Sequence, residues 1–237
     1  MSITEILKAN AEQYGIAVDD ELCRKLEIYG RLLKEWNEKI NLTAIVDDEG
    51  IAIKHFLDCL LLTKVTEFKA GMKVIDVGTG AGFPGLVLAA TFPEIQVTLL
   101  DSTEKKLRVV ASIAEEMGVK NVNIVHMRAE EAGKKPEFRE KYHIATARAV
   151  AELRVLLEYT LPFVKPGGAF LSLKGAIAEQ EIASANNSLK TLSGKIQETR
   201  DFSLPGGDKR IIVNVKKISQ IPSKYPRASA QISKKPL

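Results

Sequence analysis

The segment 76–85, which reads Asp-Val-Gly-Thr-Gly-Ala-Gly-Phe-Pro-Gly, constrains the fold of this chain more than any other feature. The apolar run 74–77 has the character of a buried strand, and residues 85–91 have that of a helix. Glycines at a strand-to-helix turn let a ligand approach the backbone, and the helix behind them offers amide donors and a positive dipole end. The segment therefore predicts an α/β fold with a ligand site at this turn.

The chain after this turn alternates between short apolar runs and helical segments. Strands joined by right-handed crossover helices give such an alternation, in a parallel sheet with both faces covered. Two last runs flank a Leu-Pro-Gly-Gly turn and predict an antiparallel pair. We therefore expect a Rossmann-like, mostly parallel seven-stranded sheet with a C-terminal antiparallel strand pair and an N-terminal helical cap. The expected strands are 74–77, 96–100, 122–126, 142–146, 168–174, 195–202 and 210–215, and the expected helices between them include 85–91, 104–117 and 152–164.

The first 70 residues have helical periodicity instead. Six apolar residues recur at steps of 4, 3, 4, 3 and 4, which places them on one stripe of a helix that Asp19 or Asp20 would cap. A second helix is expected to follow Asp47-Asp48-Glu49 and to reach about Leu62. We expect three parts: a helical cap at 1–70, a ligand-binding domain at 71–218 and a basic tail at 219–237. The stripe consists of Leu22, Leu26, Tyr29, Leu33, Trp36 and Ile40.

Positive charge is concentrated at the C-terminal end. Residues 216–237 contain six Lys or Arg residues and no Asp or Glu, whereas the whole chain has a net charge of only +4. Residues 1–215 therefore sum to −2, with 28 basic against 30 acidic residues. One interpretation is an anionic partner that contacts this end, and the other is a solubilising, frayed terminus.

Several classes of protein are excluded by what the sequence does not contain. No stretch reaches the roughly 18 apolar residues of a membrane span, and the N-terminus lacks the basic and apolar regions of a secretory signal. Cys23 and Cys59 form no CxxC pair and accompany no histidine cluster, which argues against a disulfide framework or a structural metal site. We expect a cytoplasmic monomer without a metal.

Two ligand classes compete for the glycine turn. Gly80, Gly82 and Gly85 match the GxGxxG pattern of dinucleotide-binding folds. Asp76, however, would repel a pyrophosphate and favour a cationic amine, while Asp101 at the end of the next strand can accept ribose hydroxyls. S-adenosylmethionine carries an amine, a sulfonium and a ribose but no phosphate, so it fits better than NAD or FAD. A third interpretation is a turn that is merely tightly packed.

The chain also shares a series of short motifs with one family. They are WNEKINLT at 36–43, HFLD at 55–58, IDVGTGAGFPG at 75–85, LDS at 100–102, RAE at 128–130, TARA at 146–149 and LKG at 173–175. On these residues the chain resembles class I methyltransferases and, more narrowly, the RsmG (GidB) family of bacterial ribosomal RNA methyltransferases, over nearly its whole length. Cys59 departs from the family pattern, which suggests serine there.

The resemblance implies an activity and a set of site residues. The family transfers a methyl group from S-adenosylmethionine to N7 of a guanine in 16S rRNA, so the implied partner is 16S rRNA or a small-subunit precursor. It also implies that Gly78 and Phe83 line the cofactor turn, that Ala129 and Glu130 lie beside the adenine, and that Arg148 binds the cofactor and closes the site at the fourth strand end.

The residues themselves fit this chemistry. Methylation of a pyrimidine C5 needs a thiolate, but both cysteines lie in the N-terminal part. Exocyclic amine methylation typically uses an Asn/Asp-Pro-Pro-aromatic turn after the fourth strand, where this chain has Ala-Thr-Ala-Arg at 145–148. Guanine N7 attacks through a free lone pair, so alignment rather than a general base is required. We expect Arg148 to act by positioning. An NAD-dependent oxidoreductase and a nucleic-acid-binding module with a vestigial cofactor fold are the competing hypotheses.

Several polar residues remain candidates with two interpretations each. Arg128, Arg148, Arg154 and Lys174 lie near strand ends, where they would hold phosphates or stack on a base; Arg154 equally suits a solvated helix face, and Lys174 is undecided.

The remaining candidates lie elsewhere in the chain. His55 and Asp58 share a helix face and either line the crevice or form a packing pair. Asn37 and Asn41 either contact RNA or cap the first long helix, and His126 and His143 are expected in the core.

Overall fold

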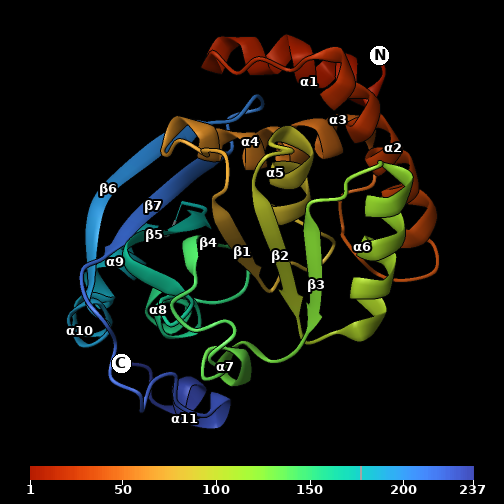
Figure 1. Ribbon diagram of the computed structural model, residues 1–237. Helices are drawn as coiled ribbons and strands as arrows, with labels where there is room; N and C mark the ends of the chain where they lie inside the picture. The colour runs from red at the N-terminus through yellow and green to blue at the C-terminus, as the bar shows by residue number, and fades with distance from the viewer. Residues whose placement is uncertain (177) are drawn as a thin grey trace.

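A computed structural model describes residues 1–176 and 178–237 of the chain. Its centre is a seven-stranded sheet in the order β3-β2-β1-β4-β5-β7-β6 (Figure 1). Strands β1 to β5 pair in parallel, whereas β7 is antiparallel to both β5 and β6. The predicted α/β fold class is confirmed. The strands are β1 (Lys73–Val77), β2 (Gln96–Asp101), β3 (Val122–His126), β4 (Tyr142–Arg148), β5 (Val164–Lys174), β6 (Gly194–Ser203) and β7 (Lys209–Lys217).

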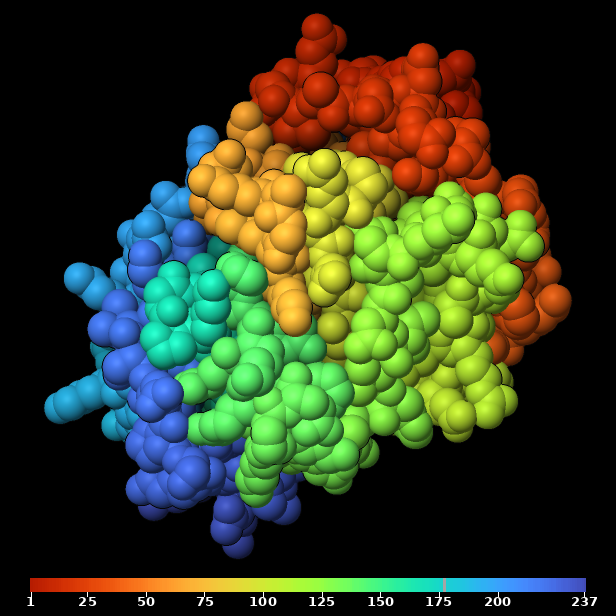
Figure 2. All heavy atoms as spheres, viewed as in Figure 1, coloured from red at the N-terminus to blue at the C-terminus, as the bar shows by residue number. Residues whose placement is uncertain are grey.

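Helices cover both faces of this sheet, and the side chains of β1 alternate between two cores. In the first core, Val74 packs with the N-terminal helices, α5 and α6. In the second core, Ile75 and Val77 pack with α8, α10 and the C-terminal segment, residues 216–237. The space-filling view shows the N-terminal helices and the C-terminal segment at opposite ends of the molecule (Figure 2). The helices are α1 (Ile3–Ala11), η1 (Glu12–Tyr14), α2 (Asp20–Asn37), α3 (Asp48–Gly50), η2 (Ile51–Leu57), α4 (Asp58–Leu60), η3 (Leu61–Lys64), α5 (Gly85–Thr91), α6 (Glu104–Glu116), α7 (Ala129–Ala132), α8 (Leu153–Thr160), α9 (Ala178–Ser184), α10 (Asn186–Thr191) and α11 (Ser229–Lys234).

The N-terminal helices differ from the expectation at their ends. Asp19 caps α2 by accepting a hydrogen bond from the Leu22 amide at 2.7 Å. The helix ends at Asn37, before Ile40, because the Asn37 side chain accepts from the amides of Leu42 and Thr43 and turns the chain away. The Asn37 side chain therefore stabilises the turn that follows α2 without donating to a carbonyl of the helix, and its contact with RNA stays a prediction.

Two other predicted helices are altered. The helix expected after residue 49 is broken into short pieces, and its middle, η2, is a π-helix of seven residues. Such π-helical turns are rare and frequently occur at functional sites. The helix expected at 152–164 ends at Thr160, since Pro162 lacks an amide hydrogen and cannot continue it.

The C-terminal segment is packed against the second core. Ile221 and Tyr225 are buried in that core, and Ile232 of α11 is buried as well, so the interpretation of the segment as a frayed terminus is wrong. Two of its six cations are held in ion pairs: Lys217 with Glu140 at 2.6 Å and Arg227 with Glu158 at 2.6 Å. The other four cations, Lys216, Lys224, Lys234 and Lys235, are exposed.

Candidate functional site

A cleft with a volume of about 1010 Å³ opens at the carboxyl ends of β1, β2 and β4. Small-molecule sites range from roughly 300 to 1,000 Å³, so this cleft has room for a cofactor and part of a second molecule. One half is lined by the glycine turn and by the ends of β2 and β3. The other half is lined by the loop after β4 and by the N-terminal layer, including His55 and Asp58.

Asp76 lies beneath the glycine turn and not in the cleft. Its side chain is completely buried, on the face of β1 that packs against α5. Its Oδ2 accepts hydrogen bonds from the Thr79 hydroxyl at 2.6 Å and the Gly85 amide at 2.9 Å, and its Oδ1 accepts from the Thr146 hydroxyl at 3.2 Å. The direct ligand contact that the sequence predicted for Asp76 is therefore not available. The carboxylate instead holds the turn and satisfies an amide at the N-terminus of α5.

Asp76→Asn is expected to change the pH dependence of stability while keeping the hydrogen bonds of the turn. The amide oxygen can accept from Thr79 and Gly85, and the amide nitrogen can donate to Thr146. Burial raises the pKa of Asp76 from 3.8 to about 6, so the stability that its protonation provides is present below about pH 4 and is lost as the pH rises through 6. Between about pH 4 and 7 the wild type should lose on the order of 2 kcal/mol relative to the variant in urea unfolding. A flat difference, or one of opposite sign, contradicts this.

Six backbone amides of the glycine turn donate hydrogen bonds inside the protein. Their acceptors include two carboxylates: Oδ2 of Asp76 at the Gly85 amide and Oδ2 of Asp101 at the Gly80 amide, both at 2.9 Å. In dinucleotide-binding folds the amides of the turn and the helix N-terminus hold the pyrophosphate. In this protein the Asp76 carboxylate already occupies the N-terminus of α5. The residues whose amides donate internally are Gly78, Thr79, Gly80, Gly82, Phe83 and Gly85.

The glycines of the turn have different roles. Gly78 lines the cleft with a φ of 73°, and a Cβ there would lie 2.8 Å from Cγ2 of Val150 in the loop after β4. Gly82, with a φ of 103°, does not line the cleft; a Cβ there would lie 2.5 Å from the Tyr29 hydroxyl. The ligand contact predicted for Gly82 is thus replaced by packing against α2.

Tyr29 connects the N-terminal layer to the turn. Its hydroxyl donates to the Ala81 carbonyl at 2.7 Å, and its ring stacks on Phe83 with centroids 5.0 Å apart. Phe83 in turn lines the cleft and stacks on His55 with centroids 4.4 Å apart. The sequence pattern places Tyr29 only on a helical core stripe, because helical spacing does not reveal a hydrogen bond to a loop 52 residues away.

Tyr29→Phe should weaken the cofactor turn as well as the fold. Loss of one buried hydrogen bond costs about 1 kcal/mol of unfolding free energy, and we expect a several-fold weaker affinity for S-adenosylhomocysteine. Thermal unfolding and calorimetric titration measure the two effects. The matched control is Tyr142→Phe, which removes a buried hydroxyl bonded to Thr98 at 3.2 Å, away from the turn. Equal loss of ligand affinity in both variants would refute a specific role for Tyr29.

Asp101, Ala129 and Glu130 line the same half of the cleft. The Asp101 carboxylate accepts from the amides of Gly80 at 2.9 Å and Thr103 at 2.8 Å. An ionised carboxylate has about four lone-pair sites, so Asp101 keeps acceptor capacity for the hydroxyls of a ribose. The cleft therefore fits an adenosyl ligand at these residues.

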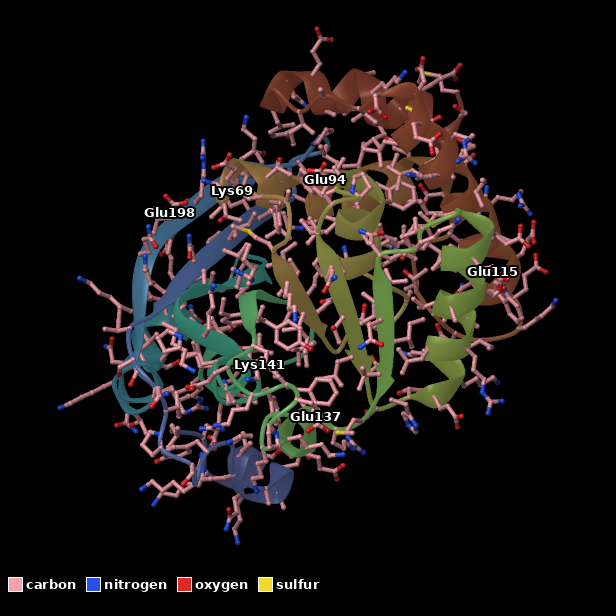
Figure 3. The ribbon with its side chains drawn as sticks, in the orientation of Figure 1. Lys69, Glu94, Glu115, Glu137, Lys141 and Glu198 are labelled. Atoms are coloured by element: carbon pink, nitrogen blue, oxygen red, sulfur yellow. The ribbon has the colours of Figure 1, made fainter. Side chains whose placement is uncertain are left out.

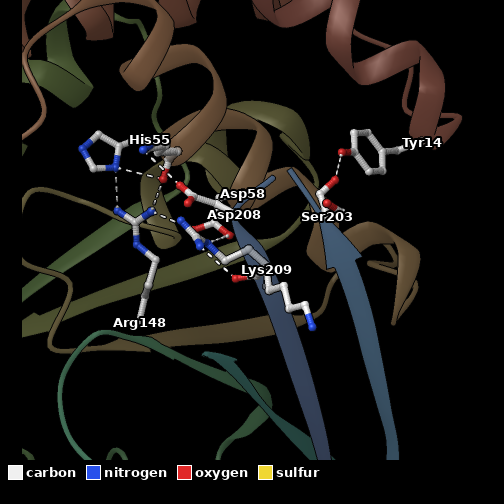
Figure 4. Close-up of polar contacts among 9 residues, drawn as sticks. Tyr14, His55, Asp58, Arg148, Ser203, Asp208 and Lys209 are labelled. Atoms are coloured by element: carbon white, nitrogen blue, oxygen red, sulfur yellow. Dashed lines mark hydrogen bonds and ion pairs between the residues drawn. The ribbon is translucent and has the colours of Figure 1, made fainter. Parts of the chain in front are cut away.

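The other half of the cleft contains a polar cluster around Arg148 (Figure 4). Its Nη1 donates to the Lys54 carbonyl at 3.0 Å and to Oδ2 of Asp58 at 3.1 Å, and its Nη2 lies 3.1 Å from Nδ1 of His55. Arg210 at the start of β7 reaches the other oxygen of Asp58 at 3.2 Å. His55 and Asp58 thus both line the crevice, while their hydrogen bonds also hold η2 and its end against β4.

Burial controls the protonation of this cluster. Burial and the nearby Arg148 lower the pKa of His55 to about 3, so the imidazole is neutral at physiological pH. A neutral His55 can accept from Arg148 at Nδ1 while Nε2 donates to the Thr43 hydroxyl at 2.8 Å. Burial also raises the pKa of Asp58, against the effect of the two arginines.

The remaining candidates separate into cleft residues and others. Lys174 lines the cleft, but an ion pair with Glu181 at 2.7 Å uses its charge. Arg128 lines the cleft and is exposed, whereas Arg154 pairs with Glu152 at 2.8 Å on the surface. The sequence pattern does not indicate Arg210 as a site residue, because its position beside Asp58 depends on the place of the antiparallel strand β7 in the sheet.

Both strand histidines lie outside the core, contrary to expectation. His126 is exposed and lies 3.1 Å from the Ser102 carbonyl, and His143 accepts from the Lys73 amide at 3.0 Å. Asn41 is exposed. Within residues 1–176 and 178–237, no group of three or more His, Cys, Asp or Glu side chains is arranged to hold a metal, and no helix is long and apolar enough to span a membrane.

The architecture matches that of solved Rossmann-like methyltransferases. TrmN from Thermus thermophilus aligns with a TM-score of 0.54 and 20% identity over 68% of this chain and 48% of that chain. A mutant of the 16S rRNA (adenine(1408)-N(1))-methyltransferase from Catenulisporales acidiphilia aligns with a TM-score of 0.54 and 16% identity, over 65% of this chain and 88% of that chain. At these identities the likeness shows the fold alone: the fold is that of Rossmann-like methyltransferases.

Sequence relatives define the family within that class. The model of the GidB family, rRNA small subunit methyltransferase G, matches residues 22–212. The ribosomal RNA small subunit methyltransferase G of Acetivibrio thermocellus is 47% identical over 100% of this chain and 98% of its own length. That of Clostridium perfringens strain 13 is 42% identical over 100% of both chains. The chain belongs to the rRNA small subunit methyltransferase G family.

Proposed function

We propose that the protein transfers a methyl group from S-adenosylmethionine to N7 of a guanine in 16S ribosomal RNA. The observation that carries the choice of cofactor is the occupation of the turn's amides by internal acceptors, with the Asp76 carboxylate at the helix N-terminus. A pyrophosphate would meet this charge where six amides of the turn already donate inside the protein, whereas an adenosyl ligand needs only the ribose acceptor that Asp101 provides. Membership of the family supports small-subunit rRNA as the substrate.

The residues of the cleft divide between cofactor and base. We assign Asp101 to the ribose hydroxyls, Ala129 and Glu130 to the adenine, and Gly78 and Phe83 to the turn beneath the ligand. S-adenosylmethionine, when bound, supplies the electrophilic methyl. We assign the half of the cleft around Arg148 to the target guanine. We also propose that the protein acts in the cytoplasm, where ribosomal subunits are assembled.

The proposed chemistry needs no proton acceptor. The N7 lone pair lies in the plane of the base and forms the new bond to carbon as the sulfonium is released as a thioether. His55 keeps no free imidazole nitrogen, since one faces Arg148 and the other Thr43. Burial raises the pKa values of both Cys23 and Cys59, which disfavours a thiolate nucleophile. The protein therefore contributes alignment, which can lower a barrier by several kcal/mol, up to about 7–11 in ideal cases.

The test uses labelled S-adenosylmethionine with small-subunit rRNA from cells that lack this protein, both as free rRNA and within the 30S particle. We expect one labelled 7-methylguanosine, located by nuclease mapping, in at least one of the two substrates. Label at a different atom, or no transfer to either substrate, would reject the proposal.

We also propose that the exposed lysines of the C-terminal segment contact RNA near the cleft; Ser229, at the start of α11, lines the cleft, which supports this. Replacing Lys224, Lys234 and Lys235 by glutamine should reduce the slope of log K against log salt by up to about 2, at about 0.7 counterions per contact. These substitutions spare the buried residues that a deletion would remove.

The control for this experiment replaces Lys69, Lys73 and Lys120, which are exposed at the opposite end of the sheet (Figure 3 shows Lys69). We expect it to keep the wild-type slope. Equal slopes for both triple variants would show that the C-terminal lysines make no RNA contact.

A further inference from the structure

Asp58 is a buried carboxylate shared by two arginines from distant parts of the chain. Its side chain is 6% exposed, and each of its oxygens lies within 3.2 Å of a guanidinium nitrogen, of Arg148 and of Arg210. The first arginine ends β4 and the second lies near the start of β7, while Asp58 itself follows directly after the π-helix η2. The carboxylate therefore connects three elements at one wall of the cleft.

Arg148 is fixed at several points, but part of its guanidinium is left for a ligand. Its Nη1 donates to two acceptors, the Lys54 carbonyl and Asp58, and its Nη2 donates to His55. A guanidinium has five N–H donors, so Nε and one hydrogen of Nη2 have no acceptor among the described residues. The side chain is 15% exposed, lines the cleft and lies over the Phe83 ring at 4.8 Å.

The buried ion pairs of Asp58 with Arg148 and Arg210 are expected to add little to the stability of the fold. Desolvation of a buried ion pair offsets much of its attraction, and apolar replacements of such pairs are often neutral or stabilising. What a carboxylate fixed between two arginines does provide is orientation, because charged hydrogen bonds hold a guanidinium in one plane.

We infer that Asp58 is a positioning residue: by bridging Arg148 and Arg210 it holds the free donors of Arg148 in the orientation that aligns the target base. The inference rests on the proposed function, because it takes the base to occupy this half of the cleft. Asp58 acts through Arg148 and does not touch the substrate. The acceptor that suits these donors on guanine is O6, the carbonyl oxygen next to N7.

The experiment compares wild type, Asp58→Asn, Arg148→Met and the double variant in methyl transfer at saturating RNA and cofactor. Asp58→Asn should lower kcat by about 10- to 100-fold, because misplacement by about 1 Å costs on the order of 10²-fold. Its affinity for S-adenosylhomocysteine should stay within about twofold of wild type, because the ligand assigned to Asp101 lies in the other half of the cleft. In the Arg148→Met background, Asp58→Asn should cause no further loss, since its effect passes through that arginine.

Asp208→Asn is the matched control. Asp208 lies next to the cluster and pairs with Lys54 at 3.0 Å, but both side chains are more than 40% exposed, so the substitution should leave kcat unchanged (Figure 4). If Asp58→Asn fails to fold, as shown by loss of its cooperative thermal unfolding transition, Arg210→Gln replaces it, because that variant removes the second anchor of Asp58. It should also lower kcat and should also have no effect in the Arg148→Met background.

The outcomes separate the two proposals. Absence of transfer to N7 by the wild type rejects the proposed function itself. An active wild type with unchanged kcat in the folded Asp58 or Arg210 variant overturns the inference alone. Losses that multiply in the double variant also overturn it, because Asp58 would then act independently of Arg148.

Discussion

Arg148→Met is expected to lower kcat for rRNA methylation by about 10²- to 10³-fold, the range seen when one positioned hydrogen-bond donor is removed from an active site. Methionine keeps much of the apolar stem but none of the N–H groups. Arg148 contacts His55, Asp58 and Phe83, and not the strand end that contains Asp101. Binding of S-adenosylhomocysteine should therefore weaken only a few-fold. Single-turnover kinetics and calorimetry measure the two effects.

The matched control is Arg24→Met on α2. Arg24 pairs with Glu21 at 2.9 Å, and both side chains are more than half exposed. This substitution should leave kcat and ligand affinity unchanged. If Arg148→Met keeps its kcat and loses only cofactor affinity, Arg148 belongs to the cofactor half of the cleft and the division of the site is wrong.

The second large effect is on stability. Gly85→Ala should lower the free energy of unfolding by about 3 kcal/mol, the upper part of the usual range for overpacking a core. The added Cβ would overlap the Leu99 side chain and would lie 2.7 Å from Cβ and 2.8 Å from Oδ2 of Asp76. Asp76 cannot move aside, since three hydrogen bonds hold its carboxylate in a fully buried position.

Gly175→Ala is the control, because a Cβ there meets no atom of residues 1–176 and 178–237 within 4 Å. Its stability should stay within about 0.5 kcal/mol of wild type in urea unfolding. S-adenosylhomocysteine should raise the stability of the wild type by mass action and that of Gly85→Ala by less. Equal stability of the two alanine variants would contradict the close packing of Gly85 on Asp76.

The fold was predictable from sequence because its signals are local. Runs of four to eight residues, separated by helical periodicity, located the strands, and the glycines located the turn. Asp101, Ala129, Glu130 and Arg148 line one cleft because parallel strands bring their carboxyl ends to one edge of the sheet. The antiparallel pair followed from its Pro-Gly-Gly turn.

The predictions from sequence were wrong or incomplete where the direction of a side chain, or a partner distant in the chain, decides the role of a residue. Asp76 shares a face of β1 with Val74, so strand alternation itself could have placed it against α5 instead of in the cleft. The position of Arg210 beside Asp58 needs the order of β7 in the sheet, and the π-helix of η2 depends on tertiary packing. Neither can be derived from local periodicity.

Calorimetric titration of the purified protein with S-adenosylhomocysteine and, separately, with NAD tests the central claim most directly. We predict one-to-one binding of S-adenosylhomocysteine, abolished by Asp101→Ala, and no heat of binding with NAD. Saturable binding of NAD at this cleft, with none of the adenosyl ligand, would contradict the account.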